Sequence, residues 1–299
     1  MEKNYLNKYL KYKQKYFNLK QSLSGGTIRV SKAYKILNSL TVADGILDPD
    51  TINNIPSDGS YNAGVLFIGS LSSEPENIRV LCGKSNNTRG SQLDTFGGRI
   101  ERGETILIGV IREVIEEIFN FPPTDEIINM LSKYFNKSAK DSYKIIELAP
   151  KSYCYIFDIS TLGNIIEIMN LPRGAGKNNS TFLKYMIKGK FNNNASVPNI
   201  KKTDFKEGAP IIMGQAPSVT INLQSFMRER QIPGVPARNG LNEVLVIGFP
   251  SINKLLKEAG EKPFIYNFTN EREGGTEELP TRSIFGRLLK HPAVQKFTV

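Results

Sequence analysis

Residues 98–117 read G-R-I-E-R-G-E-T-I-L-I-G-V-I-R-E-V-I-E-E. The second half is apolar enough to form a packed helix, and at 100° per residue Glu113, Glu116 and Glu117 share one helical face. Like charges at this spacing destabilise a helix by a few tenths of a kcal/mol per pair, and a divalent cation would offset that repulsion. Carboxylate oxygens suit Mg²⁺ or Mn²⁺, which keep water and substrate phosphate in their remaining positions. The stretch therefore predicts a metal-dependent site for phosphate chemistry.

The same stretch resembles the Nudix box, which is Gly, five residues, Glu, seven residues, then Arg-Glu-apolar-x-Glu-Glu-x-Gly-apolar. The residues in register are Gly98, Glu104, Arg112, Glu113, Val114, Glu116 and Glu117. The chain departs from the box at its end, where Phe119 replaces the closing glycine and Asn120 the apolar residue. Asparagine tolerates a positive φ, and Pro122-Pro123 cannot continue a helix. We therefore expect the helix to end one residue late.

Apolar runs on both sides of the box predict a sheet. Strands are expected from β-branched and apolar content at residues 63–68, 78–82, 143–148, 153–158 and 242–249. Helices are expected at residues 31–40, 125–135, 251–258 (with Ser251 as N-cap) and 281–290. The resemblance covers residues 61–160 and 241–299, and it implies an α+β fold, an α/β/α Nudix sandwich with a mixed sheet.

Two further segments are expected beside this domain. Residues 1–26 read as a basic amphipathic N-terminal helix that ends at Gly25-Gly26. The second is a large basic insertion at about 161–240, which is expected to interrupt a Nudix hydrolase domain of residues 27–299. Helices within this insertion are expected at 181–188 and 223–230. The lysine-rich opening also resembles those of proteins from giant DNA viruses of the mimivirus type, which implies a viral protein.

The net charge of +10 is unevenly distributed. Residues 1–24 carry six lysines against Glu2, a balance of +5, and residues 161–240 carry eleven Lys or Arg against four acids, a balance of +7. The rest of the chain therefore sums to −2. Basic segments beside a phosphate-cleaving site indicate a polyanionic substrate larger than a free nucleotide, RNA above all. The alternative is a basic surface that serves solubility.

Three residue types restrict the class of protein. Cys82 and Cys154 lie in apolar runs and read as reduced thiols, which favours a reducing compartment, the host cytoplasm or a virion. No apolar run approaches the roughly 20 residues of a membrane helix, and the N-terminus lacks a signal-peptide core, so we expect a soluble protein. His291 is the single histidine, which excludes a zinc site built from histidines. We interpret it as structural or exposed at the surface.

The resemblance implies a reaction and its site residues. The reaction is hydrolysis of a phosphorus-containing anhydride, in which water attacks a nucleoside diphosphate linkage. Glu113, Glu116 and Glu117 would bind Mg²⁺ or Mn²⁺, with the Gly97 carbonyl as a further ligand. Arg112 would orient a box glutamate through a charge-assisted hydrogen bond. Glu104 would support the geometry of the loop and the helix.

The general base is left open between a box glutamate and a later carboxylate. Glu243 is the first later candidate, followed by Glu277 or Glu278 in the segment E-R-E-G-G-T-E-E, which is expected to be a loop. A carboxylate that acts beside a bound cation should have a depressed pKa, because the positive charge favours the ionised form.

Three functions are compatible with these residues. The first is decapping of mRNA, in which the chain binds capped RNA and cleaves the pyrophosphate linkage of the 5′ cap. The second is hydrolysis of free nucleotides, dinucleoside polyphosphates or diphosphoinositols. The third is a catalytically silent Nudix-fold protein that binds RNA or belongs to the virion. Steeply salt-dependent RNA binding separates the first from the second, and metal-dependent product release separates both from the third.

Overall fold

The structure is a computed structural model, and it describes part of the chain. The described residues are 32–71, 74–87, 90–119, 123–137, 142–159, 161–162, 165, 212–213, 243–258, 265–270 and 275–298. The expected N-terminal helix at 1–26 and the expected helices at 181–188 and 223–230 lie outside these residues. No helix among them is long and apolar enough to cross a membrane.

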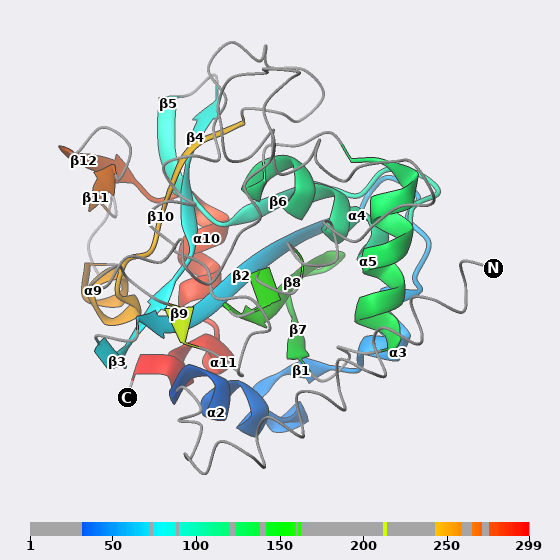
Figure 1. Cartoon of the computed structure of the whole chain (residues 1–299), viewed down its shortest axis with the longest axis horizontal. Helices are drawn as coiled ribbons and strands as arrows, with labels where there is room; N and C mark the ends of the chain where they lie inside the picture. The colour runs from blue at the N-terminus through cyan, green and yellow to red at the C-terminus, as the bar shows by residue number, and fades with distance from the viewer. Residues whose placement is uncertain are drawn as a thin grey trace, which may run out of the picture.

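The main sheet has seven strands, and its long central strand is β2 (Asn62–Leu71) (Figure 1). Its order is β1-β7-β8-β2-β3, and β6 and β9 also pair with β2. The other strands are β1 (Ile46–Leu47), β3 (Glu74–Val80), β6 (Phe96–Arg99), β7 (Tyr143–Ala149), β8 (Ser152–Asp158) and β9 (Ile212–Met213). β2 runs parallel to β8 and antiparallel to β3, β6 and β9. The sheet is mixed, and together with the helices it makes the fold α+β, as the sequence predicted.

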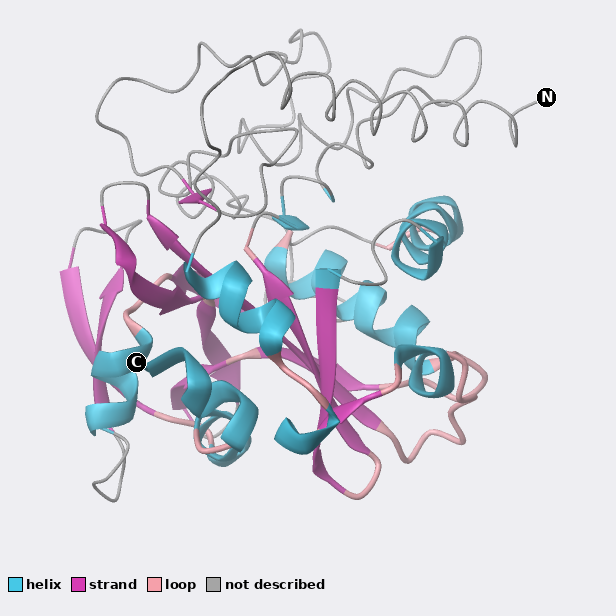
Figure 2. Cartoon of the chain, turned by 90° about the horizontal axis from the view of Figure 1, so that it is seen from below, coloured by secondary structure: helices cyan, strands magenta, loops and turns pink. Residues whose placement is uncertain are grey.

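Helices cover both faces of this sheet (Figure 2). Along β2, Val65 and Phe67 pack into one apolar cluster, and Leu66 and Ile68 pack into another, because successive side chains of a strand point to opposite faces. The first face is covered by α3 (Pro49–Asn53), α4 (Ile106–Glu113), the π-helical turn η2 (Val114–Ile118) and α5 (Asp125–Lys137). The second is covered by α2 (Lys32–Ser39), α9 (Ile252–Glu258), α10 (Ser283–Leu289) and α11 (Pro292–Gln295).

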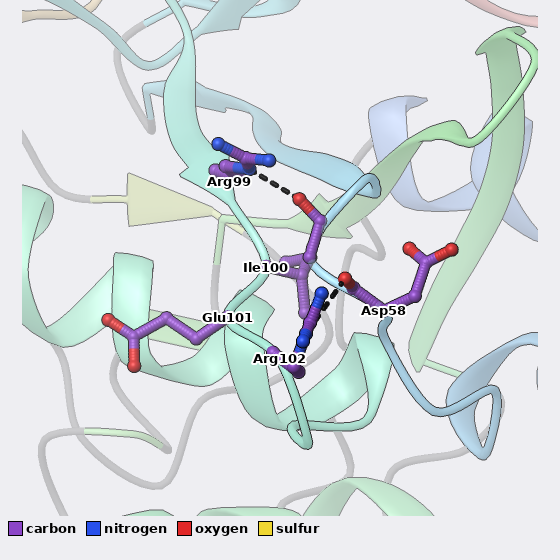
Figure 3. Close-up of a pocket in the computed structure, with 6 residues that line it drawn as sticks. Asp58, Arg99, Ile100, Glu101 and Arg102 are labelled. Carbon is purple, nitrogen blue, oxygen red and sulfur yellow. Dashed lines mark hydrogen bonds between the residues drawn. The ribbon is translucent and has the colours of Figure 1, made fainter.

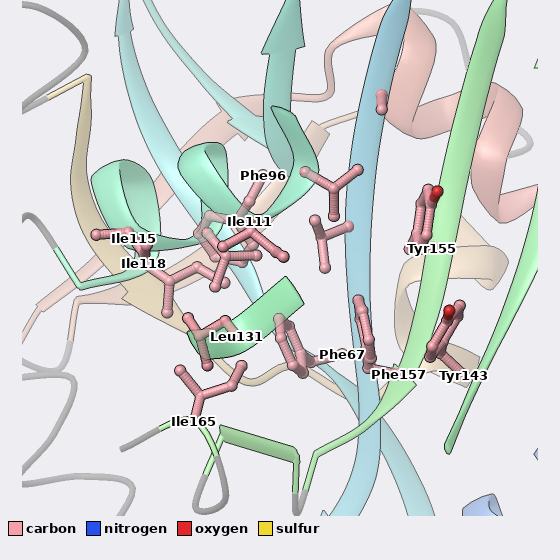
Figure 4. Packing of buried hydrophobic residues seen from close by; sticks show 14 of the residues in the cluster. Phe67, Phe96, Ile111, Ile115, Ile118, Leu131, Tyr143, Tyr155, Phe157 and Ile165 are labelled. Carbon is pink, nitrogen blue, oxygen red and sulfur yellow. The ribbon is translucent and has the colours of Figure 1, made fainter. Parts of the chain in front are cut away.

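The first cluster has an aromatic centre (Figure 4). The rings of Phe67 and Phe157 stack with their centroids 5.2 Å apart, and those of Tyr143 and Tyr155 with centroids 5.6 Å apart. Asn53 satisfies both tyrosine hydroxyls, since its Nδ2 donates to the Tyr143 hydroxyl at 2.7 Å and its Oδ1 accepts from Tyr155 at 2.9 Å. These paired polar groups allow the rings to be buried without an unsatisfied donor.

A second, three-stranded sheet has the order β10-β4-β5. Its strands are β4 (Cys82–Asn87), β5 (Gly90–Asp94) and β10 (Val244–Gly248). The prediction of one strand at 78–82 is wrong, because β3 ends at Val80 and β4 begins at Cys82. β3 pairs with β2 only as far as Val80, because β6 occupies the next part of the same edge of β2. The chain therefore leaves the main sheet at Leu81. The Leu81 N–H still donates to the Phe67 carbonyl at 2.9 Å.

The segment expected as an acidic loop is also different. Glu277 and Glu278 lie in strand β12 (Gly275–Pro280), which pairs antiparallel with β11 (Ile265–Asn270). Gly275 is the first residue of this strand, and Leu279 is buried between the exposed Glu278 and Pro280, as the alternation of a strand requires.

The remaining predicted elements are present with small shifts of their bounds. The strands at 143–148, 153–158 and 242–249 correspond to β7, β8 and β10, and the helices at 31–40, 125–135, 251–258 and 281–290 correspond to α2, α5, α9 and α10. Both cysteines are free and buried, and burial raises the pKa of each thiol. His291 is structural, since it is the N-cap of α11 and its Nδ1 accepts from the Ala293 N–H at 3.2 Å.

Candidate functional site

The predicted box folds as a strand, a tight loop and a helical segment. β6 ends at Arg99, and α4 begins after the N-cap Thr105. Three backbone hydrogen bonds hold the loop to the segment before β2, namely Ser57 N–H to Glu104 O (2.8 Å), Gly103 N–H to Ser57 O (3.0 Å) and Ile106 N–H to Ile55 O (3.1 Å). The loop is therefore fixed at both ends before any side chain of the site is considered.

The helical segment is not a regular α-helix throughout. Residues 106–113 are α-helical, and residues 114–118 form a π-helical turn, with the Phe119 N–H bonded to the Val114 carbonyl five residues earlier. The wider turn rotates Glu116 and Glu117 relative to an unbroken α-helix, a departure often found at functional sites. Phe119 keeps a right-handed helical backbone. The sequence predicted that the helix ends one residue late, at Asn120, but Asn120 lies outside the described residues.

Glu113, Glu116 and Glu117 are buried together, with 7%, 6% and 7% of their surface exposed. Buried carboxylates are rare unless they are paired. The predicted face is thus present, although two of its three members come from the π-helical turn. These three residues are called the carboxylate cluster below.

Arg112 is the cation of the cluster. Its Nη1 donates to Glu113 Oε1 at 2.8 Å and to Glu116 Oε2 at 3.0 Å, and its Nε donates to Glu104 Oε1 at 3.0 Å. Its Nη2 donates to the Arg99 carbonyl at 2.9 Å. Burial alone would lower the pKa of Arg112, but the Glu104 hydrogen bond and the charges of Glu113 and Glu104 raise it. The bond from Arg112 to box glutamates that the sequence predicted is present, and it reaches two of them.

Glu104 links the loop to α4. Its Oε2 accepts from the Glu101 N–H at 2.9 Å, while its Oε1 accepts from Arg112. An added Cβ on Gly109 would lie 3.1 Å from Glu104 Oε2 and 2.5 Å from Ile100 Cδ1. The helix approaches the loop closely at this point, and Glu104 fills the space between them.

Two glycines make room for the carboxylates. Gly97 has φ +135°, and an added Cβ would lie 2.3 Å from the Ala63 carbonyl oxygen; its N–H donates to Glu117 Oε2. On Gly98 an added Cβ would lie 2.7 Å from Glu113 Oε1. A larger residue at position 98 would displace Glu113, whereas one at position 97 would collide with the backbone of β2 at Ala63 and Gly64.

The cluster contains three carboxyl groups, and Arg112 bonds two of them. Burial raises the pKa of Glu113 to about 7, which outweighs the opposing charge of Arg112. Burial also raises the pKa of Glu116, and it raises that of Glu117 well above the ordinary value, with Glu113 adding to the effect. These directions describe the site without a cation, and each would be reversed by an added positive charge.

Further acids surround the cluster, among them the first predicted base. The charge of Glu243, just before β10, contributes to the raised pKa of Glu113, Glu116 and Glu117. Glu243 itself is exposed. The structure therefore brings Glu243 to the box across more than a hundred residues of sequence. Of the other two candidates, Glu278 is exposed on β12, and the side chain of Glu277 is not described.

Sequence reasoning missed Asp94 and Arg282. The Asp94 side chain is 6% exposed, and its Oδ2 accepts from Arg282 Nη1 at 2.7 Å. The charge of Asp94 contributes to the raised pKa of Glu117, and those of Glu117 and Glu243 contribute to the raised pKa of Arg282, whose main cause is the Asp94 hydrogen bond. Asp94 could have been noticed as an acid three residues before the glycine pair that opens the box. Arg282 had no local signal, because it lies 188 residues from its partner.

The donor set of the cluster suits a hard divalent cation, because it consists of carboxylate oxygens alone. In the described part of the chain, no three His, Cys, Asp or Glu side chains converge as metal ligands do. Arg112 bonds one oxygen of Glu113 and one oxygen of Glu116. The other two oxygens, Glu113 Oε2 and Glu116 Oε1, accept no hydrogen bond from Arg112. The residues thus fit such an ion in chemistry and charge, and binding would require the carboxyl groups to turn.

Comparison with known proteins gives no match to a protein-family model, a curated protein or a solved structure. The case for a function therefore rests on the residues of the site. Those residues combine three buried carboxyl groups, the half-buried guanidinium of Arg112 and the exposed carboxyl group of Glu243, whose charge acts on the cluster.

Proposed function

We propose that this chain is a Nudix hydrolase, a divalent-metal-dependent enzyme that cleaves a nucleoside diphosphate linkage, and that its substrate is the 5′ cap of mRNA. The observation that carries the proposal is the burial of Glu113, Glu116 and Glu117 around the guanidinium of Arg112. An excess of buried negative charge destabilises a protein unless a cation compensates for it. The α/β/α layering fits the same proposal.

Each residue has a role that its contacts support. Glu113, Glu116 and Glu117, with the Gly97 carbonyl, would hold Mg²⁺ or Mn²⁺, which when bound neutralises the diphosphate and activates a water molecule. Arg112 fixes the orientation of Glu113 and Glu116 through charge-assisted hydrogen bonds. Glu104 keeps Arg112 in place and joins it to the loop.

Glu243 is the base in this proposal. It is exposed and acts electrostatically on all three members of the cluster. A carboxylate in that position would accept a proton from the attacking water at one of its oxygens and later release it to solvent. The buried glutamates are less suited to this step, because one oxygen of each is engaged by Arg112 or by the Gly97 N–H and the proposed metal ion would take oxygens that remain.

Capped RNA is favoured over a free nucleotide by the charge of the chain. The segments 1–24 and 161–240 together carry +12, whereas the rest of the sequence, which holds the carboxylate cluster, sums to −2. A long polyanion gains from such flanking charge, whereas a small nucleotide that fills one pocket gains little.

The test uses RNA whose cap phosphates are labelled. Wild-type protein should release the cap as a nucleoside diphosphate in the presence of Mg²⁺ or Mn²⁺ and release nothing in EDTA. Glu117→Gln should reduce turnover by at least about 100-fold, because the amide keeps the volume and removes the charge. Glu147→Gln, an exposed glutamate on β7, is the matched control and should retain turnover.

Two results would contradict the proposal. Equal turnover by wild type and Glu117→Gln would show that the carboxylate cluster is not the active site. Release of product from free nucleotides or diphosphoinositols but not from capped RNA would retain the metal site and reject the substrate. Absence of metal-dependent release from every one of these compounds would favour a binding protein without turnover.

A further inference from the structure

A surface hollow of about 430 Å³ lies beside the loop that leads into the box (Figure 3). It is formed by the turn before β2 on one side and by the end of β6 and the following loop on the other. Its lining residues are Asp58, Gly59, Arg99, Ile100, Glu101 and Arg102. Neither the proposed metal ligands nor Glu243 line it.

Two arginines of the hollow are held in the same manner. The Nε of Arg99 donates to the Gly59 carbonyl, and the Nε of Arg102 donates to the Asp58 carbonyl at 3.3 Å. Within the described residues these are the only bonds of the two side chains, so the Nη atoms of both have no partner. A guanidinium fixed through Nε presents its two Nη groups as a planar fork, which matches the oxygens of a phosphate.

The two acids of the hollow leave this positive charge uncompensated. Asp58 is already engaged, since its Oδ2 accepts from Lys151 Nζ at 3.1 Å and its Oδ1 accepts from the Ser60 N–H at 2.8 Å. In Figure 3 the carboxyl group of Glu101 extends away from the arginines, and that of Asp58 points away from Arg102. With Lys151 included, the surroundings carry three cations against two carboxylates.

The loop that lines the hollow also forms hydrogen bonds with Arg112 and Glu104, which support the carboxylate cluster. The backbone carbonyl of Arg99 accepts from Arg112 Nη2 at 2.9 Å, and the Glu101 N–H donates to Glu104 Oε2 at 2.9 Å. The same loop therefore positions Arg112 on its inner side and the two free guanidinium forks on its outer side.

We propose that Arg99 and Arg102 form a phosphate-binding subsite, which holds a phosphate group of the substrate outside the bond that is cleaved. The subsite rests on the proposed function for the identity of its substrate, but phosphate binding itself needs no turnover. The phosphate would belong either to the RNA chain or to the part of the cap that stays intact. Both sources present the same oxyanion to the two forks.

The experiment measures binding of fluorescein-labelled capped RNA in EDTA, so that no hydrolysis occurs. Arg99→Gln/Arg102→Gln should bind about tenfold more weakly than wild type at 100 mM salt. On single-stranded RNA the loss of one neutralised phosphate lowers the slope of log K against log salt by about 0.7, so the double variant, which loses the one phosphate held by both forks, should lose about 0.7. Arg287→Gln, an exposed arginine on α10, carries the control for charge and should lose no more than a small fraction of this slope.

Two additional arms complete the design. The cap dinucleotide without RNA is bound by the same variants: a loss on both ligands places the phosphate in the cap, and a loss on RNA alone places it in the RNA chain. Arg99→Lys/Arg102→Lys keeps both charges but lacks the fork, and it should bind more weakly than wild type. It also replaces the glutamine variant if thermal unfolding shows that the latter does not fold.

The outcomes separate the subsite from the proposed enzyme. Unchanged affinity and salt slope in the folded double variant would overturn the subsite, even if wild type removes caps. Lack of RNA binding by wild type at 50 mM salt would overturn it as well. Loss of affinity and slope in the double variant, with no cap release by wild type in Mg²⁺ or Mn²⁺, would support the subsite and reject the enzymatic function.

Discussion

The backbone N–H of Gly97 donates a hydrogen bond to the carboxylate of Glu117, 20 residues further along the chain. This bond joins the strand β6 to the π-helical turn at the centre of the carboxylate cluster. Because β6 also pairs with β2, the cluster is attached to the central strand of the main sheet through one short strand. The positions of the carboxylates therefore depend on the backbone of Gly97 and Gly98.

Gly98→Ala should displace Glu113. The added Cβ would lie 2.7 Å from Glu113 Oε1 and 3.0 Å from its Cδ, so the carboxyl group must move. We expect a loss of about 1–3 kcal/mol in the free energy of unfolding, together with at least a tenfold loss of turnover, measured by urea unfolding and by cap release.

Gly286→Ala is the control for this change. It lies within α10, and an added Cβ meets nothing within 4 Å. The variant should be neutral or more stable by about 0.5–1 kcal/mol, because alanine favours the helix. Equal effects at positions 98 and 286 would contradict the close contact with Glu113.

Arg112→Lys should weaken the site although it preserves the charge. A lysine has one nitrogen, which cannot bond Glu104, Glu113, Glu116 and the Arg99 carbonyl in the geometry of the fork. We expect a loss of about 1–3 kcal/mol in stability and a lower turnover. Arg287→Lys, on the exposed side of α10, should remain within about 0.5 kcal/mol of wild type. If Arg112→Lys behaved in the same way, the bonds to the glutamates would contribute little.

The pH dependence of stability in EDTA should reveal Glu113. Burial raises its pKa from 4.5 to about 7 in the folded protein, so the folded state holds the proton more tightly than the unfolded chain. This contribution to stability is complete below about pH 4.5 and is lost as the pH rises through about 7. We expect a decrease on the order of 1–3 kcal/mol across that range, measured by urea unfolding at each pH.

Glu113→Gln supplies the comparison, because its amide resembles the protonated acid. Its stability should vary less between pH 4.5 and 8 than that of wild type, whereas Glu147→Gln should follow wild type. Mn²⁺ should stabilise wild type increasingly over the same range, since it competes with the proton for the carboxylates. An identical pH dependence in wild type and Glu113→Gln would contradict the raised pKa.

The parts of the site that sequence could predict are those encoded locally. The box residues in register lie within 20 consecutive residues, so their spacing alone places three glutamates together and Arg112 beside them. The π-helical turn was not predictable, because it depends on which carbonyl accepts the Phe119 N–H. The division of 78–82 into two strands was likewise not predictable, since it follows from β6 occupying the neighbouring edge of β2.

Partners that come from distant segments had no sequence signal. No role for Arg99 or Arg102 was predicted from the sequence, whereas the structure places the Gly59 carbonyl beside the Nε of Arg99 and the Asp58 carbonyl beside the Nε of Arg102. Glu243 could be proposed only by family resemblance, and its distance from the box along the chain gave no independent support. For such pairs the tertiary fold supplies the information, because it brings together charges that are remote in sequence.

Arg282 and Asp94 should be energetically coupled. The Asp94 carboxyl is buried, which raises its pKa, while the hydrogen bond from Arg282 at 2.7 Å opposes that rise. Arg282→Gln therefore leaves a buried acid without its cation, so the pKa of Asp94 should rise further and this single variant should lose stability as the pH increases. In an Asp94→Asn background the same substitution should cost little, because no charge remains to be compensated.

A double-mutant cycle from urea unfolding should give a coupling energy of about 1–3 kcal/mol at pH 8. Additive effects of the two substitutions at that pH would show that the pair does not anchor the C-terminal segment to β5.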